Sequence, residues 1–109
     1  MANQIDQIFS ALADPTRRAV IERLAKGPAP VSELHSAHDM ALPTFLRHLN
    51  VLENSGLTKS KKNGRVRTVS ICADQLKPLD KWLDQQRDNW SGRLDRLAQF
   101  AQDLERTKS

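Results

Sequence analysis

The chain lacks the features that mark a secreted, membrane-spanning or disulfide-stabilised protein. Its single cysteine, Cys72, excludes an intramolecular disulfide framework and is compatible with a reducing compartment. No segment approaches the roughly 20 consecutive apolar residues that a membrane-spanning helix needs. The first residues show neither the basic start nor the apolar segment of a signal peptide. We therefore expect a cytoplasmic protein that does not associate with a membrane.

The motifs of catalysis and cofactor binding are also missing. The sequence contains no glycine-rich phosphate loop, no nucleophile elbow and no constellation of paired carboxylates. His35 and His38 are spaced to share a helical face, but no third strong metal ligand is in evident reach. A role for Cys72 as a redox sensor stays open beside simple burial. We expect no enzymatic activity, no cofactor and no metal site.

Length and charge indicate a small domain with a polyanionic partner. The 109 residues fit one domain, residues 1–109, in which residues 73–107 form a long C-terminal dimerisation region. Seventeen Lys and Arg against thirteen Asp and Glu give a formal net charge of +4. Double-stranded DNA is a common partner of such a basic chain.

Apolar spacing and helix-end signals predict four short helices in the first half of the chain. They are expected at residues 3–12, from Pro15 to about Gly27, from a cap at Ser32 to about 38, and from 42 to 56. Residues 28–30, Pro-Ala-Pro, predict a rigid link. The third and fourth helices, joined by only a few residues, have the arrangement of a helix-turn-helix.

A β-hairpin follows the fourth predicted helix. Two extended runs, residues 57–62 and 66–71, flank Asn63-Gly64, a strong hairpin signal because both turn positions need positive φ. A basic hairpin directly after a helix-turn-helix is typical of a wing.

The last third of the sequence predicts one long helix, with Pro78 in its first turn and its end near Thr107. Its apolar residues recur every three or four positions, and a chain this small cannot cover them alone, so a second copy is expected to do so. The predicted fold is thus mainly α with a β-hairpin wing, a winged helix-turn-helix in the order α-α-α-α-β-β-α, paired as a homodimer through its N- and C-terminal helices. The predicted dimer interface comprises Ile5, Ile8, Phe9, Leu79, Trp82, Leu83, Trp90, Leu94 and Leu97.

Several short motifs carry a family resemblance. In order they are LADPTRR at 12–18, VSEL at 31–34, LP at 42–43, RHL at 47–49, VLE at 51–53, SGL at 55–57 and the basic segment 59–67. With these motifs the sequence resembles the ArsR-type winged-helix repressors. The resemblance implies a homodimer whose first and last helices form the interface and whose recognition helices enter successive major grooves of DNA.

The sequence departs from that family at three places. Metal-sensing members carry a Cys-x-Cys pair after the Glu-Leu of the third helix, where this chain has His35-Ser36-Ala37. No histidine follows His48, so the ligands of the C-terminal metal site are absent as well. Many members have a small polar residue before the basic-His pair, where this chain has Phe45-Leu46, so part of the recognition surface is expected to be apolar.

The predicted DNA-binding residues lie on the fourth helix and the wing. Arginine can donate two hydrogen bonds to guanine or bind a phosphate, and cations crowded on a hairpin repel one another unless phosphates neutralise them. Phe45 is expected either to contact a thymine methyl group or to pack against its neighbours. The predicted set is Thr44, Phe45, Arg47, His48 and Asn50 on the helix, with Lys59, Lys61, Lys62, Arg65 and Arg67 on the wing.

These observations favour a sequence-specific transcriptional regulator, a repressor that binds a pseudo-palindromic operator as a homodimer. Two alternatives stay open: a coiled-coil adaptor for other proteins and a non-specific architectural DNA binder. The sequence is compatible with a small-molecule inducer but does not identify one.

Overall fold

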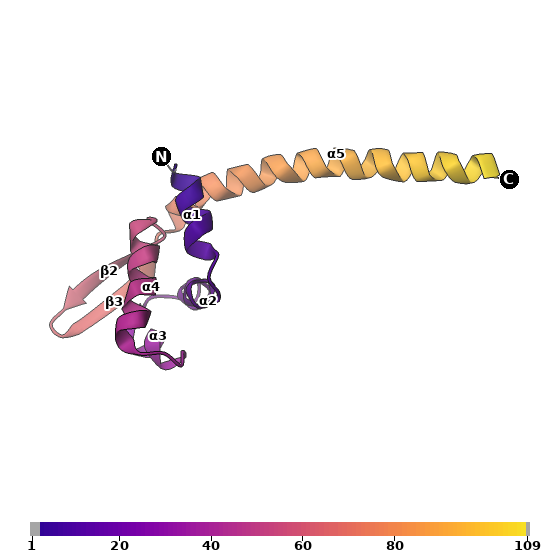
Figure 1. Cartoon of the computed structure of the whole chain (residues 1–109). Coiled ribbons are helices and arrows are strands. Elements are labelled where there is room, and N and C mark those ends of the chain that lie inside the picture. Colours follow the sequence, from indigo (N-terminus) through magenta and orange to yellow (C-terminus); the bar gives the residue numbers. More distant parts are fainter. Residues whose placement is uncertain (1–2, 109) are drawn as a thin grey trace. The chain divides into compact units, whose positions relative to one another are not determined.

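The computed structural model describes residues 3–108, and the chain divides into two compact units, residues 1–78 and 79–109 (Figure 1). The first unit holds the short elements, and the second consists of most of the last helix. The elements are α1 (Gln4–Leu12), α2 (Pro15–Leu24), β1 (Ala29–Pro30), α3 (Val31–Ser36), α4 (Leu42–Asn54), β2 (Thr58–Asn63), β3 (Val66–Ile71), the 3-10 turn η1 (Ala73–Leu76) and α5 (Lys77–Lys108). The predicted winged helix-turn-helix is confirmed.

Polar residues begin the first two helices. The side chain of Asn3 accepts a hydrogen bond of 2.9 Å from the backbone N–H of Asp6. The carboxylate of Asp14 accepts one of 3.1 Å from the backbone N–H of Arg17 and precedes a proline at the first helical position. The expected cap at Ser32 is wrong, because α3 already begins at Val31 and no side chain caps it.

The sheet has three antiparallel strands in the order β1-β3-β2, one more than predicted. Ala29 and Pro30 pair with Val69 and Thr68 of β3, so the expected rigid link is a short edge strand. A proline is tolerated there because an edge strand needs no N–H donor on its open side. Burial of Ala29 fixes this edge strand to the core.

The hairpin is confirmed, but its turn lies one residue later than predicted. Asn63 pairs with Val66, so the two turn residues are Gly64 and Arg65. Gly64 has φ +64°, whereas no non-glycine residue between 3 and 108 has positive φ. A two-residue turn that begins with glycine needs positive φ only at that glycine. Asn63 therefore keeps an extended backbone and is the last residue of β2.

The buried core lies within the first unit. Its side chains come from every helix of that unit and from the sheet, and each large one contributes about 1.5–3 kcal/mol to folding. The buried apolar residues are Ile8, Ala11, Val20, Leu24, Ala29, Leu34, Phe45, Leu49, Leu52, Leu57 and Val69. Ile8 is fully buried in this core, so its predicted place in a dimer interface is wrong.

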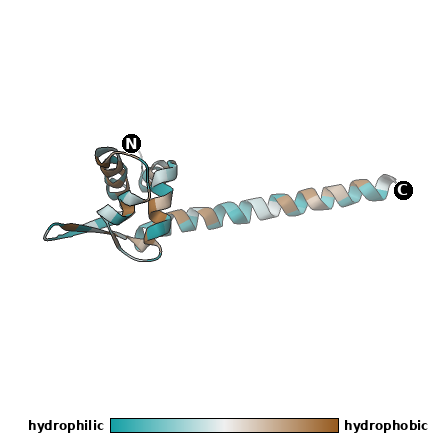
Figure 2. Ribbon diagram, turned by 90° about the horizontal axis from the view of Figure 1, so that it is seen from below, coloured by the Kyte–Doolittle hydropathy of each residue, from teal (hydrophilic) through white to brown (hydrophobic). Residues whose placement is uncertain are grey.

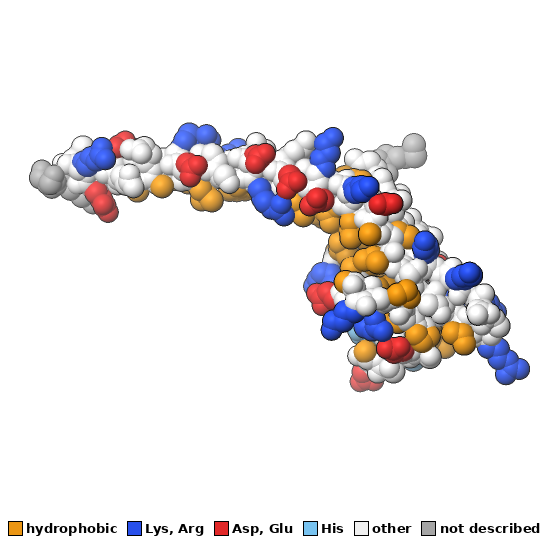
Figure 3. Space-filling model, turned by 180° about the vertical axis from the view of Figure 1, so that it is seen from behind, with side chains coloured by type: hydrophobic (Ala, Val, Ile, Leu, Met, Phe, Trp, Pro, Cys, Tyr) orange, Lys and Arg blue, Asp and Glu red, His pale blue; other side chains and the backbone are white. Residues whose placement is uncertain are grey.

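Helix α5 has 32 residues, a length of about 48 Å at about 1.5 Å per residue. The predicted long helix is therefore confirmed. Hydrophobic and hydrophilic residues alternate along the ribbon of this helix (Figure 2). In the space-filling view, apolar side chains gather along one edge of the helix and most of the charged ones along the other (Figure 3). The exposed large apolar residues of α5 are Trp82, Leu83, Trp90, Leu94, Leu97, Phe100 and Leu104.

Candidate nucleic-acid interface

The outer face of α4 presents three of the predicted DNA-binding residues. Thr44, Arg47 and Asn50 are all exposed, and their spacing of three residues places them along one side of the helix. The opposite side of α4 is fixed by the buried Leu49 and Leu52. A helix held in this way can insert its exposed side into a major groove, where the three side chains would reach base edges or phosphates.

A shallow groove of about 400 Å³ runs between this face of α4 and the hairpin. It is lined by Pro43, Leu46, Arg47, Asn50 and Arg67. Pro43 and Leu46 were not predicted as site residues. The sequence did contain a signal for Leu46. Because Phe45-Leu46 departs from the family pattern, it predicted that part of the recognition surface is apolar, and in the structure Leu46 forms that part.

Phe45 does not belong to the exposed face, which corrects its inclusion among the DNA-binding residues. Its side chain is fully buried, and its ring centroid lies 5.4 Å from that of His35 and 5.5 Å from that of His38. The ring of His35 is in turn bonded through Nε2 to the carbonyl oxygen of Met40 at 2.7 Å. Phe45 thus joins α3 to α4, and of the two expected roles the packing role is the one observed.

His48 also differs from the predicted arrangement. Its side chain is only 19% exposed, and its Nδ1 lies 3.1 Å from Nη1 of Arg17 and 3.7 Å from Oδ2 of Asp14. Burial alone would raise the pKa of the Asp14 carboxyl, but the hydrogen bond from the backbone N–H of Arg17 and the positive charge of the Arg17 side chain lower it below its usual value. One ring nitrogen of His48 is therefore engaged with the protein rather than directed at a groove.

The wing cations divide between the two faces of the hairpin. Successive residues of a strand point to opposite faces, and paired residues share a face. Lys62 pairs with Arg67, on the face that also carries the buried Val69. Lys59 and Lys61 pair with Ser70 and Thr68 and lie on the opposite face.

Arg67 is held by the protein itself. Its Nη2 donates a hydrogen bond of 2.7 Å to Oε1 of Glu53 on α4, and its Nε donates one of 3.0 Å to Oγ of Ser60. Its side chain is 35% exposed, and its Nη2 is engaged in this ion pair. Its first role in the structure is to join the wing to α4, which the sequence prediction missed.

The residues predicted for the dimer interface differ in exposure. Phe9 is exposed, whereas Ile5 and Leu79 are half-buried. Among the predicted interface residues of α5, five are exposed in the single chain: Trp82, Leu83, Trp90, Leu94 and Leu97.

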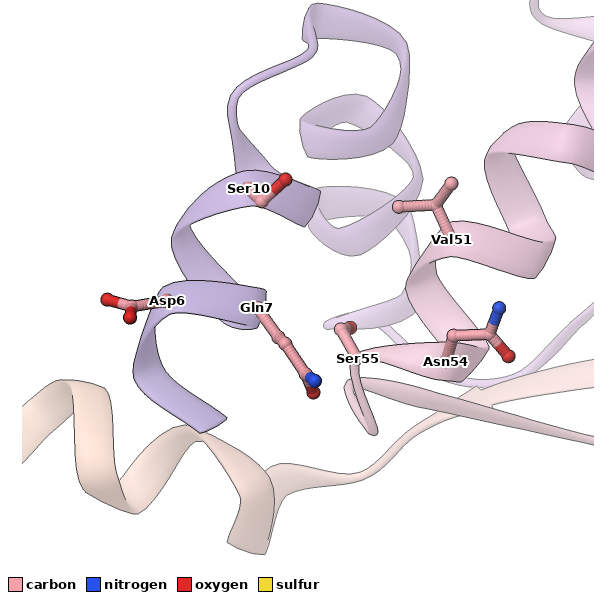
Figure 4. Close-up of a pocket in the computed structure, with 6 residues that line it drawn as sticks. All are labelled: Asp6, Gln7, Ser10, Val51, Asn54 and Ser55. Atoms are coloured by element: carbon pink, nitrogen blue, oxygen red, sulfur yellow. The ribbon is translucent and has the colours of Figure 1, made fainter. Parts of the chain in front are cut away.

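A second hollow of about 300 Å³ lies between α1 and the end of α4 (Figure 4). Gln7 points toward Ser55 in this view, whereas Asp6 points away from α4. The hydroxyl of Ser55 is bonded to the carbonyl oxygen of Leu52 at 2.7 Å. This lining contains no arrangement typical of catalysis.

Between residues 3 and 108, no group of three or more His, Cys, Asp or Glu side chains is placed to hold a metal ion. Cys72 is a half-buried free thiol. None of the described helices combines the length and apolar character needed to cross a membrane.

Comparison with known proteins agrees with this geometry. The helix-turn-helix domain family matches residues 12–60. The chain is 38% identical over 79 residues to the HTH-type transcriptional regulator Rv2034 of Mycobacterium tuberculosis, a match that covers 72% of this chain and 74% of that protein.

Solved structures extend the match. The ArsR family transcriptional regulator RHA00566 has 49% sequence identity and a TM-score of 0.77, over 82% of this chain and 98% of that one. A homodimeric winged helix-turn-helix DNA-binding domain from Mycobacterium bovis has 25% identity and a TM-score of 0.63, over 78% and 79% of the two chains. The exposed face of α4, the basic wing and these relatives together show that the chain belongs to the ArsR family of HTH-type transcriptional regulators.

Proposed function

We propose that two copies of this chain bind a pseudo-palindromic DNA operator and repress transcription from it in the cytoplasm. The observation that carries the proposal is the exposed side of α4, which lies next to a hairpin with four exposed cations. As a member of a regulator family the chain is not an enzyme. We therefore expect it to act by binding DNA rather than by catalysis.

The DNA-binding surface is built from α4 and the wing. On α4, exposed polar side chains would read base edges, and Leu46 would offer an apolar contact to a thymine methyl group. On the wing, cations would neutralise phosphates and release counterions. The proposed residues are Thr44, Leu46, Arg47 and Asn50 on α4, with Lys59, Lys61, Lys62 and Arg65 on the wing.

A second copy of the chain is the proposed partner of α5. The exposed large apolar residues of α5 form an apolar stripe, which includes Trp90 and Leu94. These two side chains are 56% and 60% exposed in the single chain. Water-exposed apolar residues at this spacing favour pairing with another helix. A neighbour of the same fold is itself homodimeric. Such a dimer would present two recognition helices to half-sites about one helical turn, roughly 34–36 Å, apart.

An inducer is not required by this proposal. If the protein responds to one, the ligand would favour a dimer geometry in which the two α4 helices no longer match successive major grooves.

The experiment is a selection of duplexes from random DNA by the full chain, followed by mobility-shift titration of the selected duplex. A scrambled duplex of the same composition serves as the control. We expect an inverted repeat and a complex that survives competition by the scrambled duplex. Equal affinity for both duplexes would indicate an architectural DNA binder, and no complex with either would indicate a protein adaptor; both results contradict the proposal.

A further inference from the structure

Arg17 links three elements of the first unit through its side chain. Its Nε donates a hydrogen bond of 2.6 Å to the carbonyl oxygen of Ala11, and its Nη2 donates one of 3.2 Å to that of Ser10, both at the end of α1. Its Nη1 lies 3.1 Å from Nδ1 of His48 on α4. A residue of α2 thus joins the last turn of α1 to the helix that carries the proposed base contacts.

The chemistry of the two side chains fixes the direction of that last bond. A guanidinium has only N–H donors and no acceptor, so Nδ1 of His48 must be the acceptor. This bond therefore requires an Nδ1 without a proton and an N–H at Nε2. The carboxylate of Asp14 lies 3.7 Å from the same Nδ1 and is bound to the backbone N–H of Arg17 at 3.1 Å.

We propose that Arg17 is a positioning residue for DNA recognition, which fixes the orientation of α4 relative to the end of α1 through Nδ1 of His48. The inference rests on the proposed function, since orientation of α4 matters only if α4 reads DNA. Hydrogen bonds to base edges depend on sub-ångström placement, whereas wing cations bind phosphates with little regard to sequence. Loss of the link should therefore reduce discrimination between sequences more than it reduces overall affinity.

Arg18 provides a matched control. It is the next residue of α2, and its Nη1 donates a hydrogen bond of 2.8 Å to the carbonyl oxygen of Leu12, also at the end of α1. The side chain of Arg17 also contacts His48 on α4, whereas the hydrogen bond from the side chain of Arg18 goes to α1. Replacement of either arginine by alanine removes one positive charge and at least one bond to α1.

The test measures the dissociation constants of each variant for the selected duplex and for its scrambled counterpart. Discrimination is the dissociation constant for the scrambled duplex divided by that for the selected duplex. We expect Arg17→Ala to reduce this ratio about tenfold. Arg18→Ala should change that ratio by no more than about twofold. If the wild type discriminates and Arg17→Ala discriminates equally well, the positioning role is wrong and the proposed function stands. If the wild type does not discriminate, both are wrong.

A double-mutant cycle shows whether Arg17 acts through His48. In a His48→Ala background, Arg17→Ala should reduce discrimination no further, because the link is already broken. Additive losses would contradict the proposal. If Arg17→Ala does not fold, His48→Leu replaces it, since that variant leaves the bonds from Arg17 to α1 intact. His48→Leu should lose discrimination, and His48→Gln, whose side-chain oxygen can accept from Arg17, should restore most of it.

The tautomer of His48 gives a readout that needs no DNA. In mildly alkaline solution, the imidazole ¹⁵N shifts of the wild type and of Arg18→Ala should show an unprotonated Nδ1 and a protonated Nε2. Arg17→Ala should show a mixture of both tautomers. A proton on Nδ1 of the wild type would contradict the proposed link.

Discussion

The two units of the chain use apolar residues in opposite ways. In the first unit, Phe45 is fully buried, and its ring packs near those of His35 and His38. In α5, Phe100 is 62% exposed, and the other large apolar residues of the stripe are exposed with it. The first unit therefore contains the contacts that fix its own geometry, whereas the stability of α5 must depend on what covers its stripe.

This difference separates the two tasks of the proposed regulator. Recognition needs side chains at fixed positions, and α4 is held by a buried face and by the links from Arg17 and Arg67. Association needs an exposed apolar surface that becomes buried only in the dimer. The same substitution should consequently have different effects in the two units.

The largest effect is expected from Phe45→Ala. Removal of this buried ring leaves a cavity and should lower the free energy of unfolding by about 3–5 kcal/mol. The matched variant is Phe100→Ala, which should cost far less in the single chain because its ring already contacts water. Denaturant unfolding of both variants, at concentrations where the chain is monomeric, measures this difference. Equal losses would show that α5 is as well packed as the first unit.

Trp90→Ala should weaken the dimer without unfolding the first unit. Loss of a large aromatic side chain from the centre of an interface costs about 2 kcal/mol or more, a rise of about 30-fold in the dissociation constant. Sedimentation velocity over a range of concentrations measures it. Asp88→Ala is the control and should leave the dimer intact, because Asp88 is exposed and lies two residues before Trp90, toward the opposite side of the helix. An unchanged profile for Trp90→Ala would place Trp90 outside the interface.

Arg47→Ala should affect DNA and not the dimer. If Arg47 reads a base, its loss should cost about 1–3 kcal/mol on the selected duplex and relax the preference at one position. Mobility-shift titration against duplexes with single changes measures this preference. The same loss on every duplex would show that Arg47 binds only phosphate.

The two faces of the wing allow a finer comparison. Lys62 lies on the face shared with Arg67, and Lys61 lies on the other. Each lysine that contacts a phosphate should lower the slope of log affinity against log salt by about 1 when it is replaced by alanine. We expect both variants to show this change, since both side chains are exposed. A change for only one of them would show which face of the hairpin lies against the DNA backbone.

The smallest effect concerns Asp14. Because the folded pKa of its carboxyl is lowered, its charge stabilises the fold above the unfolded pKa of about 3.9, and this contribution is lost as the pH falls through the folded pKa. Asp14→Asn keeps a capping oxygen and removes the charge, whereas Asp14→Ala removes both and should cost about 1 kcal/mol at neutral pH. The advantage of the wild type over Asp14→Asn should disappear on acidification. An advantage that persists in acid would contradict this cause.

The sequence predicted the helix order, the wing and the long helix because these depend on local signals. Pro15, Gly64 and the apolar spacing of α5 act within a few residues of themselves. It did not predict strand β1, because Ala29 and Pro30 find their partners about forty residues away in β3. Local preference cannot reveal such a pairing.

The candidate site shows the same limit. The exposed Thr44, Arg47 and Asn50 follow from helical periodicity. The contacts of Phe45, His48 and Arg67 depend on side chains from other elements, and each of these residues is turned toward the protein. Their residue types alone fit a DNA contact equally well, which is why the sequence grouped them with the exposed residues.

The stoichiometry of the complex with the selected duplex shows whether two chains bind one DNA site. Analytical ultracentrifugation of the wild type with that duplex should give two chains per duplex, and footprinting should show two protected half-sites about 10–10.5 base pairs apart. One chain per duplex, or protection without a fixed spacing, would contradict binding of the operator by a dimer.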